Sequence, residues 1–287
     1  MSFSKLKLRL IAPIFRNLPQ FRGKSRVAKY IFNNSLDTKN LDVIARDKSE
    51  YIIPNLREPI GFYLLIDGIY EKHSLDFIRR QLPSGGVFID IGANIGVFTI
   101  TAAKFLKETG LVIAVEASPN IFSYLQKNIE SNKLTNVKTL EFAVAEHDHS
   151  TVSFYEAPTD HFGMGSLAPQ FHNSPIYVKT KTLDTLIHDE KIEQVDLIKV
   201  DVEGYEASVF KGAKKLLTSV NAPIILFEFC DWAEARVPGG NIGDSQRVLK
   251  EFGYKIWRIN DFIKGNQPLN IILEKGSDML IGSKYGN

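Results

Sequence analysis

The chain has 287 residues, of which 44% are hydrophobic, so it can bury a full core as one large domain or one domain with an extension. No apolar run approaches the roughly 18–20 residues of a membrane-spanning helix, and the single cysteine, Cys230, cannot form an intrachain disulfide. We therefore expect a chain that does not cross a bilayer by itself and works in a reducing, cytoplasmic setting. No signal peptide is expected, because the basic, amphipathic start lacks a sustained apolar core and a cleavage site.

The formal net charge of +2 conceals an asymmetry along the chain. Residues 1–30 carry eight basic residues and no acidic one, which leaves 27 basic and 33 acidic residues in a mildly acidic body. That body disfavours nucleic acid as a partner. Apolar residues alternate with the basic ones, so residues 1–30 could contact an anionic membrane or a partner. Because Pro13 and Pro19 interrupt the segment, we favour a terminal helix packed on the main domain, with its charges in solvent.

The segment that follows is expected to complete an N-terminal extension. Residues 27–32 have a helical pattern, and two short apolar runs at 51–54 and 62–66 are typical of strands in a small ribbon. A helix is expected at 71–81. The predicted division is a basic helical and ribbon extension, residues 1–70, and a main domain, residues 71–287.

From residue 87 onward, buried strands alternate with helices. Repeated β-α units of this kind predict a mostly parallel, seven-stranded sheet with helices on both faces. The last two predicted strands have no clear helix between them, which indicates an antiparallel edge. The predicted strands are 87–91, 111–115, 137–142, 195–200, 224–227, 254–259 and 270–273, and helices are expected at 97–107, 119–132, 206–217 and 245–251.

The stretch VFIDIGANIGVFT at 87–99 combines an apolar strand, a glycine turn and the start of a helix. In α/β sheets such a turn forms a ligand crevice at the carboxyl end of the strand. Dinucleotide enzymes favour G-x-G-x-x-G, because the backbone must approach a pyrophosphate there. Asn94 occupies the place of the second glycine, which disfavours an NAD-dependent oxidoreductase.

S-adenosylmethionine has no phosphate, and it needs room for its amino-acid end and an acid for its ribose hydroxyls. Asp90 ends the first strand, near the expected methionine end. Glu116 ends the second strand, 24 residues beyond Gly92, where one carboxylate can accept both hydroxyls. Together with the glycine turn, these acids predict an S-adenosylmethionine site. The alternative is that both acids only cap neighbouring turns.

Residues 68 to about 228 resemble the FkbM family of S-adenosylmethionine-dependent methyltransferases. The most specific shared block is IKVDVEGYE at 198–206. The resemblance implies a class I methyltransferase (Rossmann-like) fold and an activity toward hydroxyl groups of sugars or natural products. The other shared blocks are GIYE at 68–71, FIDIGANIG at 88–96, Val115-Glu116 with Pro119, and residues 209–212 and 224–228.

The glycine turn and the resemblance together imply a set of cofactor contacts around S-adenosyl-L-methionine. These residues lie at the ends of the first strands, in the block before them and in a later loop. The expected contacts are Glu71, Asp90, Gly92, Ala93, Asn94, Gly96, Phe98, Glu116, Ala117, Ser118, Ala143, Ser166 and Asp201.

The acidic block after the fourth strand is the main candidate for catalysis. Alternation along an extended segment points Lys199, Asp201 and Glu203 to one side. We consider three roles for the carboxylates: holding the methionine end, orienting or deprotonating an acceptor hydroxyl, and binding a divalent metal. Glu228, after the fifth strand, could join any of them. The competing interpretation is a salt-bridge network that only ties loops together.

A long turn-rich segment, 157–175, lies between strand-like runs at 152–155 and 177–181 and suits a loop over a pocket. Family members often carry a Gly- and Ser-rich stretch here, which GSL at 165–167 matches. His161 is a candidate base or an exposed loop histidine, and Phe162 a candidate wall for the acceptor. No Cys/His spacing indicates zinc and no ligand pattern supports Mg²⁺, so no metal is predicted.

The sequence therefore predicts an enzyme that methylates a hydroxyl oxygen of a saccharide or other small molecule. Asp201, Glu203 and His161 are its predicted catalytic residues. N-methylation on the same fold is the nearest alternative, because the cofactor site does not define the acceptor atom. An NAD-dependent oxidoreductase is the alternative from a different class.

Overall fold

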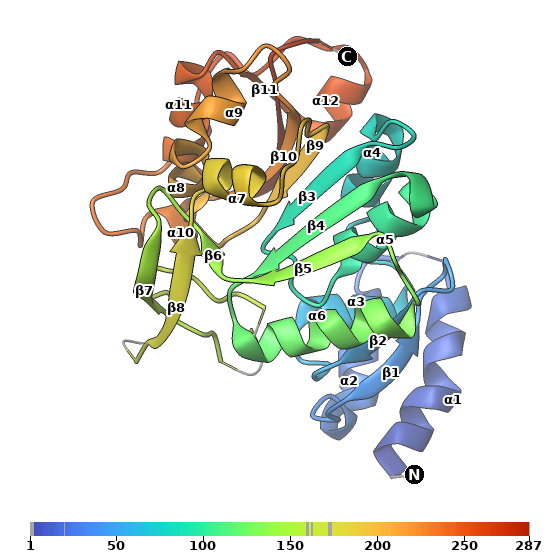
Figure 1. Cartoon of the computed structure of the whole chain (residues 1–287). Helices are drawn as coiled ribbons and strands as arrows, with labels where there is room; N and C mark the ends of the chain where they lie inside the picture. The colour runs from blue at the N-terminus through green and yellow to red at the C-terminus, as the bar shows by residue number, and fades with distance from the viewer. Residues whose placement is uncertain (1–2, 20, 159–160, 162, 172–173, 287) are drawn as a thin grey trace.

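The structure is a computed structural model that describes residues 3–19, 21–158, 161, 163–171 and 174–286. Its centre is the predicted α/β sheet of seven strands, in the order β11-β12-β10-β9-β3-β4-β5 (Figure 1). All neighbours are parallel except β12, which runs antiparallel to both β10 and β11. The expected antiparallel edge is thus confirmed. The strands are β3 (Val87–Ile91), β4 (Leu111–Glu116), β5 (Val137–Glu141), β9 (Leu197–Val200), β10 (Ile224–Cys230), β11 (Lys255–Arg258) and β12 (Ser277–Ser283).

Helices cover both faces of this sheet. The central strands are continuous apolar runs because side chains on both of their faces are buried. Phe88 of β3 packs into one hydrophobic cluster and the next residue, Ile89, into the other. The first cluster includes α4 (Lys72–Gln81), α5 (Val97–Leu106), α6 (Pro119–Ser131) and α12 (Ile259–Ile263); the second includes α7 (Leu183–Asp189), α8 (Glu206–Lys211), α9 (Lys214–Thr218) and α11 (Asp244–Glu251).

The N-terminal segment, which the sequence predicts to be an extension, packs on the first of these faces. Leu8, Ala12 and Phe15 belong to the same buried cluster as Phe88 of the main sheet. The prediction that Pro13 interrupts the first helix is wrong: the helix runs through it, because Pro13 lies on the exposed side and the buried side chains hold the turns around it. The extension consists of α1 (Phe3–Asn17), α2 (Lys24–Phe32), η1 (Asn33–Ser35), β1 (Leu41–Ile44), β2 (Glu50–Ile53) and α3 (Pro59–Ile66).

The second strand predicted for the ribbon is wrong. Residues 62–66 belong to helix α3, and the ribbon is formed by β1 and β2 instead. Helix α3 starts where the Glu58 carboxylate accepts a hydrogen bond from the Gly61 N–H and Pro59 takes the first helical position. Its apolar run is continuous because the helix is buried on most sides, which removes the helical period from the sequence.

The last predicted strand is also wrong. Residues 270–273 form no strand, because the Leu273 backbone bonds in both directions to the Gln246 side chain and so covers helix α11. The seventh strand is β12, and α12 follows β11 where no helix was expected.

A small three-stranded sheet lies beside the carboxyl ends of the main strands. It is formed by β6 (Ala143–Val144), β7 (His149–Phe154) and β8 (Ile176–Lys181). An isolated antiparallel β-bridge pairs Tyr155 with Ser166, so the chain after β7 folds back beside this small sheet. The short elements η2 (Lys107–Thr109) and α10 (Asp231–Glu234) complete the described elements. Among the helices of the described ranges, none has both the length and the apolar character needed to span a membrane.

Candidate active site

A cavity of about 220 Å³ lies at the carboxyl ends of β3, β4, β9 and β10. This is the edge of a parallel sheet where α/β proteins bind their ligands. Residues far apart in the chain line it, from the start of α3 to the end of β10. Among the described residues of the lining, six are carboxylates and none is Lys, Arg or His. The carboxylates are Glu58, Glu71, Glu116, Asp201, Glu203 and Glu228.

The glycine turn forms the floor of the cavity. Gly92 has φ +74°, and a Cβ atom placed on it would lie 1.8 Å from the carbonyl oxygen of Asp201. The N–H groups of Gly92 and Ala93 both donate to the Val115 carbonyl. Only a glycine therefore lets the turn after β3 approach the end of β9 so closely.

Replacing Gly92 by alanine is expected to destabilise the fold by about 2–6 kcal/mol, from backbone strain plus overpacking. Gly239 is a matched control, since its φ is +75° and a Cβ there would meet no atom within 4 Å. Gly239→Ala should cost only the strain, about 1–3 kcal/mol. Urea unfolding of both variants measures the difference, and equal losses would contradict the close approach.

Glu116 ends β4 as predicted and is buried. Its Oε2 accepts a hydrogen bond from the Asn94 N–H and its Oε1 one from the Ser118 N–H, both at 2.9 Å. Burial raises the pKa of its carboxyl, and these two bonds oppose that rise. Glu116 thus caps two neighbouring turns and also lines the cavity. Its interpretation as a turn cap and its interpretation as a cofactor contact are therefore compatible.

Asn94 stands where a dinucleotide fold has its second glycine. It has φ +52°, a left-handed conformation that asparagine tolerates better than most residues. Its side-chain oxygen accepts from the Ile95 N–H, and its amide donates to the Gly163 carbonyl at 3.3 Å. Asn94 therefore ties the glycine turn to the loop that covers the cavity.

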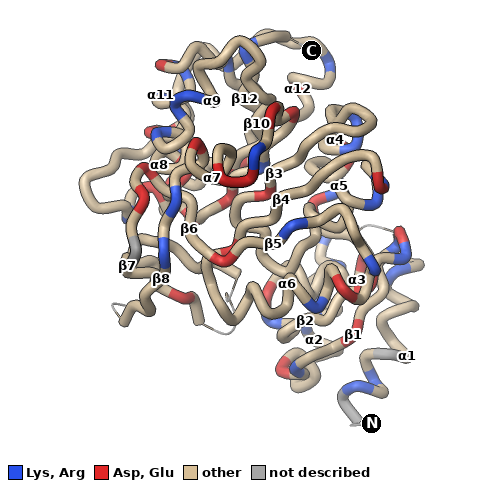
Figure 2. Tube along the Cα trace, in the orientation of Figure 1, with Lys and Arg blue, Asp and Glu red and all other residues tan. Residues whose placement is uncertain are grey.

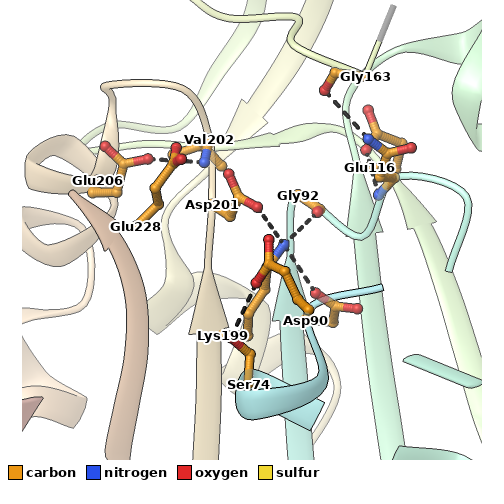
Figure 3. A network of polar contacts seen from close by, with 12 residues as sticks. Ser74, Asp90, Gly92, Glu116, Gly163, Lys199, Asp201, Val202, Glu206 and Glu228 are labelled. Atoms are coloured by element: carbon orange, nitrogen blue, oxygen red, sulfur yellow. Dashed lines mark hydrogen bonds and ion pairs between the residues drawn. The ribbon is translucent and has the colours of Figure 1, made fainter. Parts of the chain in front are cut away.

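A buried charge network connects β9 with the end of β3, next to the cavity lining (Figure 3). Lys199 Nζ donates to the Gly92 carbonyl at 2.8 Å and lies 3.2 Å from Asp201 Oδ2 and 3.6 Å from Asp90 Oδ1. Burial lowers the pKa of Lys199, but Asp201 and Asp90 outweigh it, so its pKa is raised and the ammonium stays charged. Asp90 is fully buried and also accepts from the Thr99 hydroxyl. Asp90 therefore positions Lys199 and does not belong to the lining.

The acidic block brings three carboxylates together. Single oxygens of Asp201, Glu203 and Glu228 lie within 4.8 Å of one another. Burial, then the charge of Asp201, raises the pKa of both Glu203 and Glu228 well above the ordinary value. A buried cluster of this kind holds at least one proton near neutral pH, or it holds a cation. Among the described residues, these three form the group that could bind a divalent metal, and the absence of a metal stays a prediction.

The turn that carries Glu203 is held from several sides. Glu203 itself has φ +55°, and Gly204 follows with φ +97°. Glu206 Oε1 accepts from the N–H groups of Val202 and Gly204. The Ser166 hydroxyl and the Gln170 amide both donate to the Glu203 carbonyl. The strained backbone is thus fixed by its neighbours, as in sites whose geometry serves function.

Glu206 gives the site's fold a pH dependence. Burial raises the pKa of Glu206 from 4.5 to about 8, so the folded protein keeps a proton there that the unfolded chain releases above about pH 4.5. The contribution of this proton to the free energy of unfolding is complete below about pH 4.5 and is lost as the pH rises through about 8. Glu206→Gln keeps the acceptor oxygen without the charge. We expect the variant to exceed the wild type by at least about 1.4 kcal/mol near pH 9 and by nothing near pH 4, as measured by urea unfolding.

The loop over the cavity is the turn-rich segment predicted from the sequence. Gly163 and Leu167 line the cavity, and Ser166 donates to the backbone beneath. His161 is exposed and packs edge-on against the Phe171 ring, outside the lining. Its predicted role as a base has no contact with the cavity to support it. Phe162 lies outside the described residues.

The structure brings most of the predicted site residues into one lining and leaves others outside it. Phe98 is buried, with its ring 5.1 Å from Lys199 Nζ. Ser118 caps α6 by accepting from the Ile121 N–H, and Gly96 precedes α5. The predicted residues in the lining are Glu71, Gly92, Asn94, Glu116, Ala117, Ala143, Ser166, Asp201 and Glu203; those outside it are Asp90, Ala93, Gly96, Phe98, Ser118 and His161.

Sequence reasoning missed one wall of the cavity. Glu58, Pro59 and Ile60, at the start of α3, line it together with Tyr70. Burial raises the pKa of Glu58 to about 7, opposed by hydrogen bonds from the backbone of Gly61 and Ile60. Glu58-Pro59 is a helix-start signal that could be detected in the sequence, as is Ser118-Pro119. No local pattern indicates, however, that the start of α3 faces the site.

A parallel sheet of this order, with a glycine turn after β3 and an acid at the end of β4, defines the class I methyltransferase fold. The family model of the Methyltransferase FkbM domain matches residues 90–256, more than half of the chain. The chain belongs to this family of S-adenosylmethionine-dependent methyltransferases.

Three relatives of known name are similar to the chain at 27% identity. The hexuronic acid methyltransferase AglP of Haloferax volcanii matches over 54% of this chain and 61% of its own length. Methyltransferase 1 of Beauveria bassiana matches over 64% and 83%, and the 2-O-methyltransferase NoeI of Sinorhizobium fredii over 58% and 74%. The chain thus spans less than two thirds of the archaeal relative.

Proposed function

We propose that the protein transfers a methyl group from S-adenosylmethionine to a hydroxyl oxygen of an uncharged saccharide or similar small acceptor. The observation that carries this proposal is the charge of the cavity, where six carboxylates and, among its described lining residues, no basic group meet. A cofactor with a sulfonium and an ammonium group fits such a cavity. The pyrophosphate of NAD would meet repulsion there.

The residues present fit the cofactor in two places. Glu116 has its carboxylate at the end of β4, where it would accept the ribose hydroxyls, and Gly92 of the glycine turn lines the same cavity. Asp201, paired with Lys199, and Glu71 are the acids that would face the methionine ammonium group. When bound, S-adenosylmethionine supplies a methyl group that is already activated for displacement.

The protein's own contribution is then to hold the acceptor in line and to remove its proton. Holding two reactants in a reactive geometry can be worth about 7–11 kcal/mol. Glu203 and Glu228 have raised pKa values, so each carboxylate is a stronger base than an exposed one. We propose that Glu203, which lines the cavity, accepts the proton of the acceptor hydroxyl, and that Asp201 orients this hydroxyl.

The name of one relative, a hexuronic acid methyltransferase, supports a saccharide acceptor, and the name of another, a 2-O-methyltransferase, supports transfer to oxygen. The acidic cavity favours an acceptor without its own negative charge at the reacting end. A carboxylate or phosphate placed beside Glu203 and Glu228 would not be compensated by any described cation of the lining.

The test is a methyl-transfer assay with methyl-labelled S-adenosylmethionine and matched acceptors. A neutral hexose or oligosaccharide, the corresponding uronic acid and the corresponding amino sugar are compared, and NMR locates the new methyl group. We expect O-methylation of the neutral acceptor. Transfer to nitrogen would favour the N-methyltransferase, and faster reaction of the uronic acid would contradict the argument from charge.

Two further predictions from the sequence, the division of the chain and its cellular setting, are also proposals. We propose that residues 1–70 are an extension that completes the site of a main domain at 71–287, because Glu58 and Ile60 supply one wall of the cavity. We also propose a reducing, cytoplasmic setting, with Cys230 as a buried free thiol.

A further inference from the structure

Exposed apolar side chains gather in the first 30 residues. Of the 15 large hydrophobic side chains that are exposed in the described part of the chain, seven lie before residue 31. Isolated exposed hydrophobic residues are ordinary, but a group in one short segment marks an interaction surface. The seven are Leu6, Leu10, Ile14, Leu18, Phe21, Val27 and Tyr30.

The exposed residues of α1 form a line on its outer side. Leu6, Leu10 and Ile14 follow one another at a spacing of four, so they lie on one side of the helix. They are 41%, 64% and 60% exposed. The opposite side, with Leu8 and Phe15 among its residues, is already buried against the protein. The outer line is therefore not needed for packing.

Basic residues accompany this line in the sequence, and residues 1–30 contain no acid. Figure 2 shows basic positions on α1 and no acidic one. At 100° per residue, Lys7 lies about 60° from the middle of the apolar line and Lys5 about 140° from it, and both are partly buried and donate to backbone carbonyls of the protein. Beyond α1, the side chains of Arg22, Arg26 and Lys29 are exposed. An apolar line on a helix with exposed cations close to it in the chain is a pattern of segments that lie in the surface of an anionic bilayer.

Helix α1 lies at the outer edge of the molecule, so its line can reach a flat surface (Figure 1). We propose that α1 docks the protein on a negatively charged lipid bilayer, with Leu6, Leu10 and Ile14 inserted among the lipids and the exposed cations of residues 22–29 at the headgroups. Charge complementarity selects this occupant. Lys24 is paired with Asp67 inside the protein, but Arg22, Arg26 and Lys29 are exposed in a segment that contains no acid. Anionic headgroups would pair with these exposed cations, whereas an uncharged apolar partner would not.

The experiment is co-sedimentation of the full chain with vesicles of phosphatidylcholine alone or mixed with phosphatidylglycerol. We expect binding to the mixed vesicles, at least tenfold weaker binding to the neutral ones, and a loss on raising the salt concentration. Leu10→Glu/Ile14→Glu should lower binding at least tenfold. The control Val220→Glu/Ile271→Glu adds the same charges at exposed sites elsewhere, with 85% and 71% exposure, and should bind as the wild type does.

Circular dichroism and S-adenosylhomocysteine binding check that each variant is folded. Three results would each overturn the proposal: equal binding of the two double variants, equal binding to both kinds of vesicle, or no binding to the mixed vesicles. Sedimentation equilibrium tests the competing occupant: a wild-type dimer that Leu10→Glu/Ile14→Glu dissociates would assign the line to a second copy of the chain.

Discussion

Replacing Glu203 by glutamine is expected to lower turnover about 10²–10⁴-fold, the contribution typical of a positioned general base. Glutamine keeps the size and one acceptor oxygen of the side chain but cannot take up the proton. The turn should survive, because its supports are the Glu206 carboxylate and the Ser166 and Gln170 side chains, which contact the backbone around Glu203. Single-turnover methyl transfer under saturating cofactor measures the effect.

The pH profile separates this role from a structural one. Burial and the charge of Asp201 raise the pKa of Glu203, so the basic form increases, and the rate with it, as the pH rises through that raised pKa. Glu203→Gln should lose this limb of the profile. Glu130, an exposed residue of α6, gives the control Glu130→Gln, which should leave both rate and profile unchanged. A Glu203→Gln enzyme of full activity would show that another group is the base.

Replacing Glu116 by alanine is expected to weaken cofactor binding about 100-fold or more. A hydrogen bond to a charged acceptor is worth about 1.5–3 kcal/mol, and the carboxylate would accept from two ribose hydroxyls. Calorimetric titration with S-adenosylhomocysteine measures the change directly. The loss of binding free energy should be much larger than the loss of free energy of unfolding.

Glu116 also caps backbone groups, so a second variant is needed. Glu116→Gln keeps an oxygen for the Asn94 or Ser118 N–H and is expected to keep the fold while still losing part of the affinity. Thr99, which bonds to Asp90 below the cavity, provides a comparison: Thr99→Val should affect stability more than affinity. If Glu116→Gln and Glu116→Ala both bind as the wild type does, Glu116 is only a turn cap.

The strands at the centre of the sheet could be predicted because both of their faces are buried. Residues 87–91 and 111–115 are short apolar runs, each preceded by a glycine, which leaves little alternative to a strand. Residues 62–66 have the same appearance but form a helix, because α3 is also buried on most sides. Only the Glu58-Pro59 start distinguishes the two cases.

The site residues that could be predicted are those whose place is set by the end of a strand in the parallel sheet. Glu116, Asp201 and Glu203 follow strands that end at one edge, so topology alone brings them together. Asp90 ends such a strand too, yet its side chain points beneath the cavity, toward Lys199 and Thr99. Glu58 reaches the site because the start of α3 lies beside the carboxyl ends of the main strands, which no local pattern reveals.

The most direct test of these assignments is a crystal structure with S-adenosylhomocysteine bound. We expect the ribose hydroxyls on the Glu116 carboxylate and the sulfur near Gly92, facing the Asp201 and Glu203 side of the cavity. The space beyond the sulfur should be bounded by Glu203 and Glu228. A ribose held elsewhere, or a sulfur turned away from the acidic block, would contradict them.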